Sequence, residues 1–321
     1  MSEVIKNKGS KVGAWISAMR LRTLPLSFSV ILMGSALAYS AQHATYPPYQ
    51  YSWLTFSLIL ITTLLLQILS NLANDYGDAK KGADNEGRIG PVRAIQSGII
   101  SPQEMFKGIV ITSLLALISG IWLLLEAFDY NLNGTFILFI VLGLASIAAA
   151  IKYTVGKRAY GYSGLGDLFV FMFFGLVGVL GTFYLQTKML AWPALFPAIT
   201  MGCLSVAVLN LNNMRDREND QKVGKNTLVV KFGFAWSKSY HYTLFLIAYL
   251  VFPIPILFSI LMGGDFQFFL PFIPILIIHI IHIRKVIRVK DPKDFDPELK
   301  KIALSAFLLS LLFFAMVLTV F

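Results

Sequence analysis

The residues best suited to chemistry lie in the stretch NLANDYGDAKKGAD, residues 71–84, which ends a mostly apolar run. If a helix continues into this stretch, Asn71, Asn74, Asp75 and Asp78 stand at i, i+3, i+4 and i+7 and form one polar face. Together with Asp84 they bring three carboxylates within about three helical turns, where the charges repel unless a cation lies among them. Hard oxygen ligands of this kind suit Mg²⁺, which proteins commonly hold through one or two carboxylates plus substrate phosphates.

A second stretch, NLNNMRDRENDQKVGKNTL at residues 210–228, repeats the arrangement. Asn210, Asn213, Asp216 and Asp220 stand at i, i+3, i+6 and i+10, again along one helical face. Either stretch alone is also compatible with a solvated loop, but two of them at matching helix ends favour a binding site. Two acidic helix ends on the same side can meet across a shared cavity, and a polyanion bridged by metal would fit between them.

Basic residues follow both acidic stretches: Lys80, Lys81, Arg88 and Arg93 after the first, and Lys222 and Lys225 after the second. Carboxylate, Mg²⁺, phosphate and ammonium in alternation both bind a diphosphate and stabilise it as a leaving group. A third polar segment, YTVGKRAYGYSGLGD at residues 153–167, places Tyr153 and Lys157 at i and i+4. Lys157 could neutralise diphosphate oxygens, and Tyr153 could face a cation through its ring or its hydroxyl.

Two other polar features have simpler interpretations. His279 and His282 stand at i and i+3 in a later apolar segment, but the sequence offers no third metal ligand, so we interpret them as structural or interfacial. Cys203 is the single cysteine, which excludes a disulfide framework and a CxxC metal site.

The elements that must position these residues are long apolar segments. Of the 321 residues, 56% are apolar and only 14% are charged, a composition typical of a polytopic membrane protein. Alternation at period two is absent, and the segments are about twice as long as a barrel strand, which excludes strands. We predict an all-α fold with nine helices that each cross about 30 Å of hydrocarbon, at roughly 24–42, 53–73, 105–126, 134–151, 167–187, 192–213, 242–262, 268–287 and 302–321.

The basic residues predict how these helices are oriented. If the nine helices alternate across the bilayer with the N-terminus in the cytoplasm, only Lys188 of the 27 Lys and Arg residues falls outside. The net charge of +10 is therefore mostly a topology signal, and we expect no nucleic-acid partner. We expect one membrane domain over residues 1–321, with residues 1–22 as a cytoplasmic segment that is not a removable signal peptide and with the C-terminus outside. Both acidic stretches then open long cytoplasmic loops, where function is expected.

Four segments resemble the UbiA superfamily of intramembrane aromatic prenyltransferases, in order and over nearly the whole chain: RLRTLPLS, NDYGDAKKGAD, YTVGKRAYGYSGLGD and NNMRDRENDQKVGKNTL. Within the superfamily they are most similar to the branch that prenylates 1,4-dihydroxy-2-naphthoate for menaquinone. The wider superfamily has an acidic residue four positions after the equivalent of Asp78, whereas this chain has Gly82 there and Asp84 two positions later. That spacing resembles the naphthoate branch and argues against the 4-hydroxybenzoate branch.

The resemblance implies nine helices around a cytoplasm-facing polar cavity, with a lateral route for a lipid tail, in a bacterial inner membrane. By analogy, Mg²⁺ and the diphosphate of an all-trans-polyprenyl donor are bound by five aspartates, namely Asp75, Asp78, Asp84, Asp216 and Asp220. Supporting ligands would be Asn71, Asn74 and Asn213. Contacts to the diphosphate or to the acceptor's carboxylate would come from Lys157, Arg22 and Lys222, beside the basic residues Lys80 and Arg93.

The implied reaction is electrophilic aromatic substitution. Diphosphate leaves the polyprenyl donor, the ring of 1,4-dihydroxy-2-naphthoate attacks the allylic cation, and CO₂ leaves, which gives demethylmenaquinol and, after oxidation, demethylmenaquinone. The expected partners are these two substrates and the lipid bilayer, the expected cofactor is Mg²⁺, and the sequence assigns neither prenyl chain length nor oligomeric state. Two alternatives stay open: another superfamily member, of the 4-hydroxybenzoate or haem O type, and a secondary transporter, although a transporter predicts charges deep in the bilayer.

Overall fold

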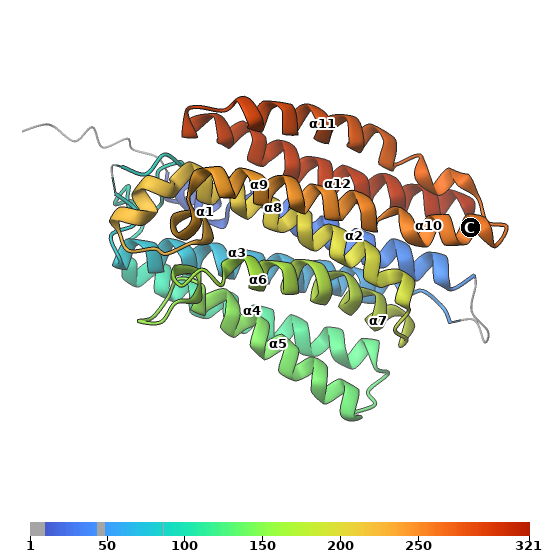
Figure 1. The fold of residues 1–321 in the computed structure, drawn as a ribbon. Coiled ribbons are helices and arrows are strands. Elements are labelled where there is room, and N and C mark those ends of the chain that lie inside the picture. The colour runs from blue at the N-terminus through green and yellow to red at the C-terminus, as the bar shows by residue number, and fades with distance from the viewer. Residues whose placement is uncertain (1–9, 44–48, 86) are drawn as a thin grey trace, which may run out of the picture.

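The computed structural model describes residues 10–43, 49–85 and 87–321, with the side chain of Arg22 also outside the description. Within those residues the chain forms helices and loops without any strand (Figure 1). The segment η3 is wound as a π-helix and the other η segments are short 3₁₀ turns. In chain order the elements are α1 (Lys11–Met19), η1 (Leu21–Thr23), α2 (Leu24–Ala41), α3 (Trp53–Lys80), α4 (Pro102–Ala127), α5 (Gly134–Lys152), η2 (Tyr160–Tyr162), α6 (Gly166–Val170), η3 (Phe171–Leu180), α7 (Gly181–Thr187), α8 (Trp192–Lys222), α9 (Leu228–Val251), α10 (Pro253–Leu261), η4 (Phe266–Phe269), α11 (Phe272–Arg288), η5 (Pro292–Asp294) and α12 (Phe295–Val320).

Nine spans among the described residues are long and apolar enough to cross a membrane. Five of them are single helices, α2, α3, α4, α5 and α8. The other four join neighbouring segments: α6 to α7 through η3, α9 to α10, η4 to α11, and η5 to α12. The prediction of an all-α, multi-pass membrane fold is confirmed.

Three helices extend beyond the apolar segments that mark them in the sequence. α3 continues to Lys80, not residue 73, and α8 continues to Lys222, not residue 213. α9 already begins at Leu228, where Thr227 caps it, and not at residue 242, although a kink at Gly233 (φ 85°, ψ 174°) interrupts its first turns. Many polar residues of these extensions are buried within the protein, so hydropathy does not mark the helix ends.

The centre of the bundle is formed by α2, α8 and α12, whose apolar windows are 56%, 72% and 50% buried. α4 and α5 lie at one margin of the bundle and α11 at the opposite margin (Figure 1). Where η3 crosses α8, a Cβ added to Gly175 would lie 2.8 Å from the Cα of Gly202 and 2.7 Å from the carbonyl oxygen of Ala198. Only glycine permits this approach, which holds the α6–α7 span against the centre.

The connections after α3, α5 and α8, residues 81–101, 153–165 and 223–227, lie at one end of the bundle beside α1 (Figure 1). The C-terminal residue lies at the opposite end. We call the end that holds these three connections the basic end, because most of the Lys and Arg residues predicted to share one side of the membrane lie there.

The two histidines that the sequence marked as structural are buried between α9, α11 and α12. His282 pairs its Nε2 with Nε2 of His241 at 2.8 Å and its Nδ1 with Oε2 of Glu298 at 2.6 Å. His279 bonds the hydroxyls of Tyr249 and Ser305 at 2.5 and 2.6 Å. The histidines therefore tie three helices together, which confirms the structural interpretation.

Candidate active site

A cavity of about 1330 Å³ opens at the basic end and runs between α2, α3, α4, α5 and the α6–α7 span. Its mouth is charged and its interior is apolar. The charged and polar lining includes Arg20, Asn71, Asn74, Asp75, Asp78, Arg88, Arg93, Tyr153, Asn212, Arg215, Lys225, Asp296 and Lys300, and neutral polar residues such as Thr63 and Gln67 lie further in. The apolar lining includes Ile59, Leu66, Leu124 and Phe139 and continues to Leu185 and Leu190, towards the opposite end.

The first acidic stretch presents its carboxylates to this mouth from the last turns of α3. Asp75 is 1% exposed and receives the guanidinium groups of both Arg20 and Arg93. Arg93 also reaches Oδ2 of Asp78 at 3.4 Å. Two guanidinium groups and two carboxylates thus share one small volume, and the guanidiniums balance the carboxylates, which would otherwise repel one another.

Asp84 lies just behind the mouth, with its side chain 1% exposed. Its Oδ1 lies 3.5 Å from Nε of Arg88 and 3.4 Å from Nε of Arg93. Burial, with the neighbouring charge of Asp78, raises the pKa of Asp84 to about 7 in spite of these cations. The carboxyl group of Asp84 therefore loses its proton near neutral pH, and the resulting carboxylate would pair with a cation placed beside it.

The second acidic stretch lies on the last turns of α8. Arg215 binds Asp216 through two contacts, 2.7 Å to Oδ2 and 3.0 Å to Oδ1, and reaches Asp296 of α12 at 2.5 Å. Lys225 lies 3.4 Å from Oδ1 of Asp220. Burial alone would lower the pKa of Lys225, but the carboxylates of Asp220, Asp78 and Asp216 outweigh it and raise the pKa, so this buried ammonium stays charged.

Tyr162, in the third polar segment, links the two acidic stretches. Its hydroxyl donates a 2.8 Å hydrogen bond to Oδ1 of Asp78, and its carbonyl oxygen accepts one of 3.1 Å from the backbone N–H of Asn226. The ammonium of Lys81 lies 3.8 Å from the centre of its ring. Three connections that are distant in sequence are therefore held in one charged cluster.

The structure distributes the predicted site residues in three ways. Six line the cavity: Asn71, Asn74, Asp75, Asp78, Arg93 and Tyr153. Four are buried beside it without lining it: Asp84, Asn213, Asp216 and Asp220. Three are exposed and outside the lining: Lys80, Lys157 and Lys222. For Arg22 the backbone belongs to η1, and its side chain lies outside the description.

Sequence reasoning missed Arg20 and Tyr162 and gave Arg215 no role. Arg20 ends α1 in a left-handed conformation, φ 49°, and reaches Asp75 across the start of α2. No spacing rule connects residue 20 to residue 75, so the sequence holds no direct signal for this pair. Tyr162 lies in the third polar segment, which also contains Tyr153 and Tyr160, and nothing in its spacing distinguishes it from those two tyrosines.

The oxygen donors of the cluster suit a hard divalent cation. Oδ2 of Asp84 and Oδ2 of Asp220 are buried, and no hydrogen bond to either is found within the described residues. In this arrangement no group of three or more His, Cys, Asp or Glu side chains in the described part of the chain is gathered closely enough to hold a metal ion by itself. The residues therefore fit Mg²⁺ in chemistry, in a site that a phosphate ligand would have to help complete.

The described residues form a helical bundle with nine apolar spans around a cavity whose mouth is charged and whose interior is mostly apolar. This is the architecture of a membrane enzyme that acts on amphiphilic substrates. The chain belongs to the UbiA prenyltransferase family, whose model matches residues 27–312. It is 43% identical, over 95% of its length and 94% of the relative, to the 1,4-dihydroxy-2-naphthoate octaprenyltransferase of Escherichia coli strain K12.

Solved structures show the same fold. A chain from a study of digeranylgeranylglyceryl phosphate synthase aligns with a TM-score of 0.61 at 17% identity, covering 97% of this chain and 100% of that one. A UbiA homolog from Archaeoglobus fulgidus, bound to DMAPP and Mg²⁺, aligns with a TM-score of 0.53 at 16% identity, covering 94% and 99%.

Proposed function

We propose that this protein transfers a polyprenyl group from all-trans-polyprenyl diphosphate to 1,4-dihydroxy-2-naphthoate, releasing diphosphate and CO₂. The observation that carries the proposal is that one and the same cavity has a mouth rich in cations and carboxylates and a long, mostly apolar interior. The name of the E. coli relative supports this donor class and this acceptor.

The chain's own groups divide the work between the two parts of the cavity. Arg20, Arg88, Arg93 and Lys225 supply positive charge at the mouth, where the donor's diphosphate binds and where negative charge grows as it leaves. The apolar walls of α3, α4 and α5 hold the prenyl tail and exclude water, which would otherwise capture the cation. Each substrate thus keeps its polar part at the basic end and its apolar part within the bundle.

Bond changes at the reacting carbons balance without an oxidant. The C–O bond between the allylic carbon and the diphosphate breaks, and the diphosphate keeps the electron pair. A ring carbon of the acceptor, the one that bears the carboxylate, forms a C–C bond to the allylic carbon. The bond to the carboxylate carbon then breaks, its electron pair restores the aromatic ring, and CO₂ leaves, which gives demethylmenaquinol.

Mg²⁺ completes the proposed site. Asp75, Asp78 and Asp84 on one side and Asp216 and Asp220 on the other would hold it, with Asn74 and Asn213 in support. When bound, Mg²⁺ neutralises diphosphate oxygens and so makes the diphosphate a better leaving group. Support comes from the buried Oδ2 atoms of Asp84 and Asp220, which accept no hydrogen bond from the described residues, and from the Mg²⁺ bound by the Archaeoglobus fulgidus homolog.

We further propose that the protein lies in a bacterial inner membrane with the basic end and the N-terminus in the cytoplasm and the C-terminus outside. The distribution of Lys and Arg supports this orientation, as does the water solubility of the acidic acceptor, which would reach the cavity mouth from the cytoplasm.

The direct test incubates purified protein in lipid nanodiscs with Mg²⁺, octaprenyl diphosphate and 1,4-dihydroxy-2-naphthoate. Mass spectrometry should detect a prenylated quinol, with one CO₂ and one diphosphate released for each. EDTA should abolish the reaction and added Mg²⁺ should restore it. Absence of the prenylated quinol, or equal rates with 4-hydroxybenzoate in competition, would overturn the assignment.

A further inference from the structure

A row of polar side chains continues along α3 beyond the carboxylates, deeper into the cavity. Gln67, Asn71 and Asp75 stand at i, i+4 and i+8 and all line the cavity wall. Because α3 runs towards the basic end, the Gln67 amide lies about two turns, or ~11 Å, further inside than Asp75. Charged groups therefore occupy the mouth, and neutral amides occupy the zone immediately below it.

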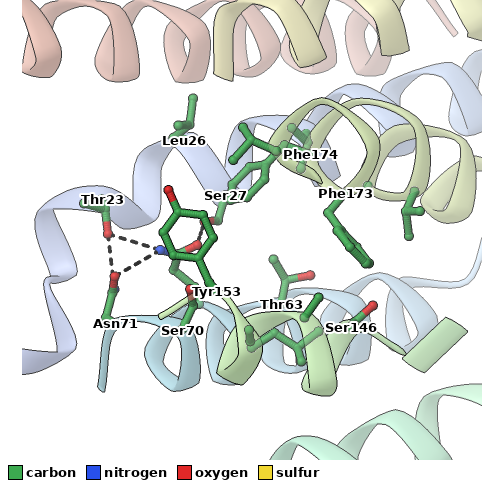
Figure 2. Close-up of a pocket in the computed structure, with 18 of the residues that line it drawn as sticks. Thr23, Leu26, Ser27, Thr63, Ser70, Asn71, Ser146, Tyr153, Phe173 and Phe174 are labelled. Atoms are coloured by element: carbon green, nitrogen blue, oxygen red, sulfur yellow. Dashed lines mark hydrogen bonds between the residues drawn. The ribbon is translucent and has the colours of Figure 1, made fainter. Parts of the chain in front are cut away.

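The amides belong to a network with two hydroxyls, those of Thr23 at the end of η1 and of Ser27 in the first turn of α2 (Figure 2). The hydroxyl of Ser27 donates to Oε1 of Gln67 at 2.8 Å, and Nδ2 of Asn71 donates to the carbonyl oxygen of Met19 at 2.9 Å. These two bonds fix which way each amide points. The oxygen of Gln67 and the nitrogen of Asn71 are engaged, the latter also lying 3.4 Å from Oγ1 of Thr23. Nε2 of Gln67 faces Oδ1 of Asn71 and Oγ1 of Thr23.

Those remaining contacts are long. Nε2 of Gln67 lies 3.5 Å from Oγ1 of Thr23 and 3.5 Å from Oδ1 of Asn71, at the outer limit of a hydrogen bond. A strong donor and a strong acceptor thus stand side by side on the cavity wall with their bonding capacity barely used. Asn71 is 3% exposed, so leaving such capacity unused in a closed site would be costly.

Aromatic rings border this point of the wall. Tyr153 and, from η3, Phe174 line the same cavity, and both rings are drawn close to Ser27 in the view of Figure 2. With Leu26 and Val30 of α2, these rings give the zone flat apolar walls around one polar contact. The shape and chemistry suit a planar aromatic molecule that carries a hydroxyl group, and do not suit a charged group or an aliphatic chain.

We propose that Gln67 and Asn71 bind a ring hydroxyl of the acceptor and thereby set acceptor specificity. The hydroxyl accepts from Nε2–H of Gln67 and donates to Oδ1 of Asn71. This inference rests on the proposed function and adds to it the residues that orient the ring. A ring bound in this way has its nucleophilic carbon directly below the diphosphate, on the side where the allylic carbon of the donor enters the apolar interior.

The test compares three acceptors in the intact protein: 1,4-dihydroxy-2-naphthoate, 1-hydroxy-2-naphthoate and 4-hydroxy-2-naphthoate. The quantity measured is the ratio of kcat/KM between the full acceptor and each analogue. One analogue lacks the hydroxyl that Gln67 binds, so the Gln67→Leu variant loses no hydrogen bond to that analogue but does lose one to 1,4-dihydroxy-2-naphthoate. The preference for 1,4-dihydroxy-2-naphthoate over that analogue should therefore fall about tenfold in Gln67→Leu. The intrinsic reactivity of each acceptor is the same in both proteins and cancels in the comparison.

Gln67→Glu provides a second variant that keeps the side-chain size and the acceptor for Ser27 but removes the N–H donor, so it tests the same bond should the leucine variant fail to fold. KM for octaprenyl diphosphate should stay within about twofold in both. Thr63→Val, one turn earlier on α3 and also on the cavity wall, is the matched control and should keep the selectivity of the native protein.

Unchanged selectivity for both analogues in both Gln67 variants would overturn the inference. That outcome differs from failure of the proposed function, in which the native protein itself would not prenylate 1,4-dihydroxy-2-naphthoate. An equal loss for all three acceptors would also count against the inference, because it would show a general structural effect and not recognition of a hydroxyl.

Discussion

Asn219 donates a 2.9 Å hydrogen bond from its side-chain amide to the carbonyl oxygen of Ala83, across 136 residues of sequence. This bond joins the end of α8 directly to the loop that follows α3. The two acidic stretches therefore converge at one end of the bundle, as their positions in the sequence predicted. The proposed diphosphate site depends on this convergence, because neither stretch supplies enough carboxylates and cations alone.

Asn219→Leu should loosen the contact between the two stretches. The variant removes the donor and leaves the Ala83 carbonyl without its partner in a buried place, which costs about 1–3 kcal/mol. We expect KM for the prenyl diphosphate to rise about tenfold, which corresponds to about 1.4 kcal/mol. Asn131→Leu, at an exposed position between α4 and α5, is the control. An unchanged KM in Asn219→Leu would show that the contact does not shape the site.

Asp78→Asn and Asp216→Asn should each lower kcat/KM about 10²–10³-fold, because each removes one charge from a preorganised electrostatic site. The shape of the side chain is retained, so the variants should still insert and fold, as judged by size-exclusion profile and melting temperature. Asp265→Asn, at an exposed position between α10 and η4, should keep full activity. Full activity in either test variant would remove that aspartate from the proposed site.

Tyr162→Phe isolates the hydroxyl that holds Asp78 in place. Hydrogen bonds to charged groups contribute about 1.5–3 kcal/mol, so kcat/KM for the prenyl diphosphate should fall at least about tenfold. The ring and its contact with Lys81 remain, which limits the change to the hydroxyl. Tyr130→Phe, an exposed tyrosine after α4, should behave as the native protein does. If both variants have the same kinetics, the bond to Asp78 has no part in catalysis.

Glu298→Ala should destabilise the protein without altering substrate affinity. This fully buried carboxylate binds His282 at 2.6 Å, Lys301 at 2.8 Å and Lys285 at 3.0 Å, and its loss leaves those groups without their anion. The two lysines are partly exposed, so the loss of their anion costs little, but the buried His282 loses a hydrogen bond to a charged group, which contributes about 1.5–3 kcal/mol. The melting temperature in detergent should therefore fall clearly. The exposed Glu218→Ala is the control for melting temperature. A normal melting temperature in Glu298→Ala would show that this network does not hold α11 and α12 together.

Local sequence patterns were sufficient for the helices and for the first acidic face. Asn71, Asn74, Asp75 and Asp78 share a face of α3 because helical periodicity brings i, i+3, i+4 and i+7 together. The same reasoning misjudged where α3, α8 and α9 begin or end. Partners from distant parts of the chain can stabilise a polar residue in a helix, and a hydropathy profile takes no account of such partners. Lys80, Lys157 and Lys222 were included for their charge and position in the chain, yet the fold leaves them exposed.

The sequence by itself determined the all-α membrane fold, the nine spans and the placement of both acidic stretches on one side, because apolar length, helical period and charge distribution are local properties. Only the tertiary structure decided which distant residues pair with those stretches. Arg20 reaches Asp75, Tyr162 reaches Asp78, and Asn219 reaches Ala83 through packing between segments far apart in the chain. Such pairs depend on where whole helices lie relative to one another, which no short stretch of sequence encodes.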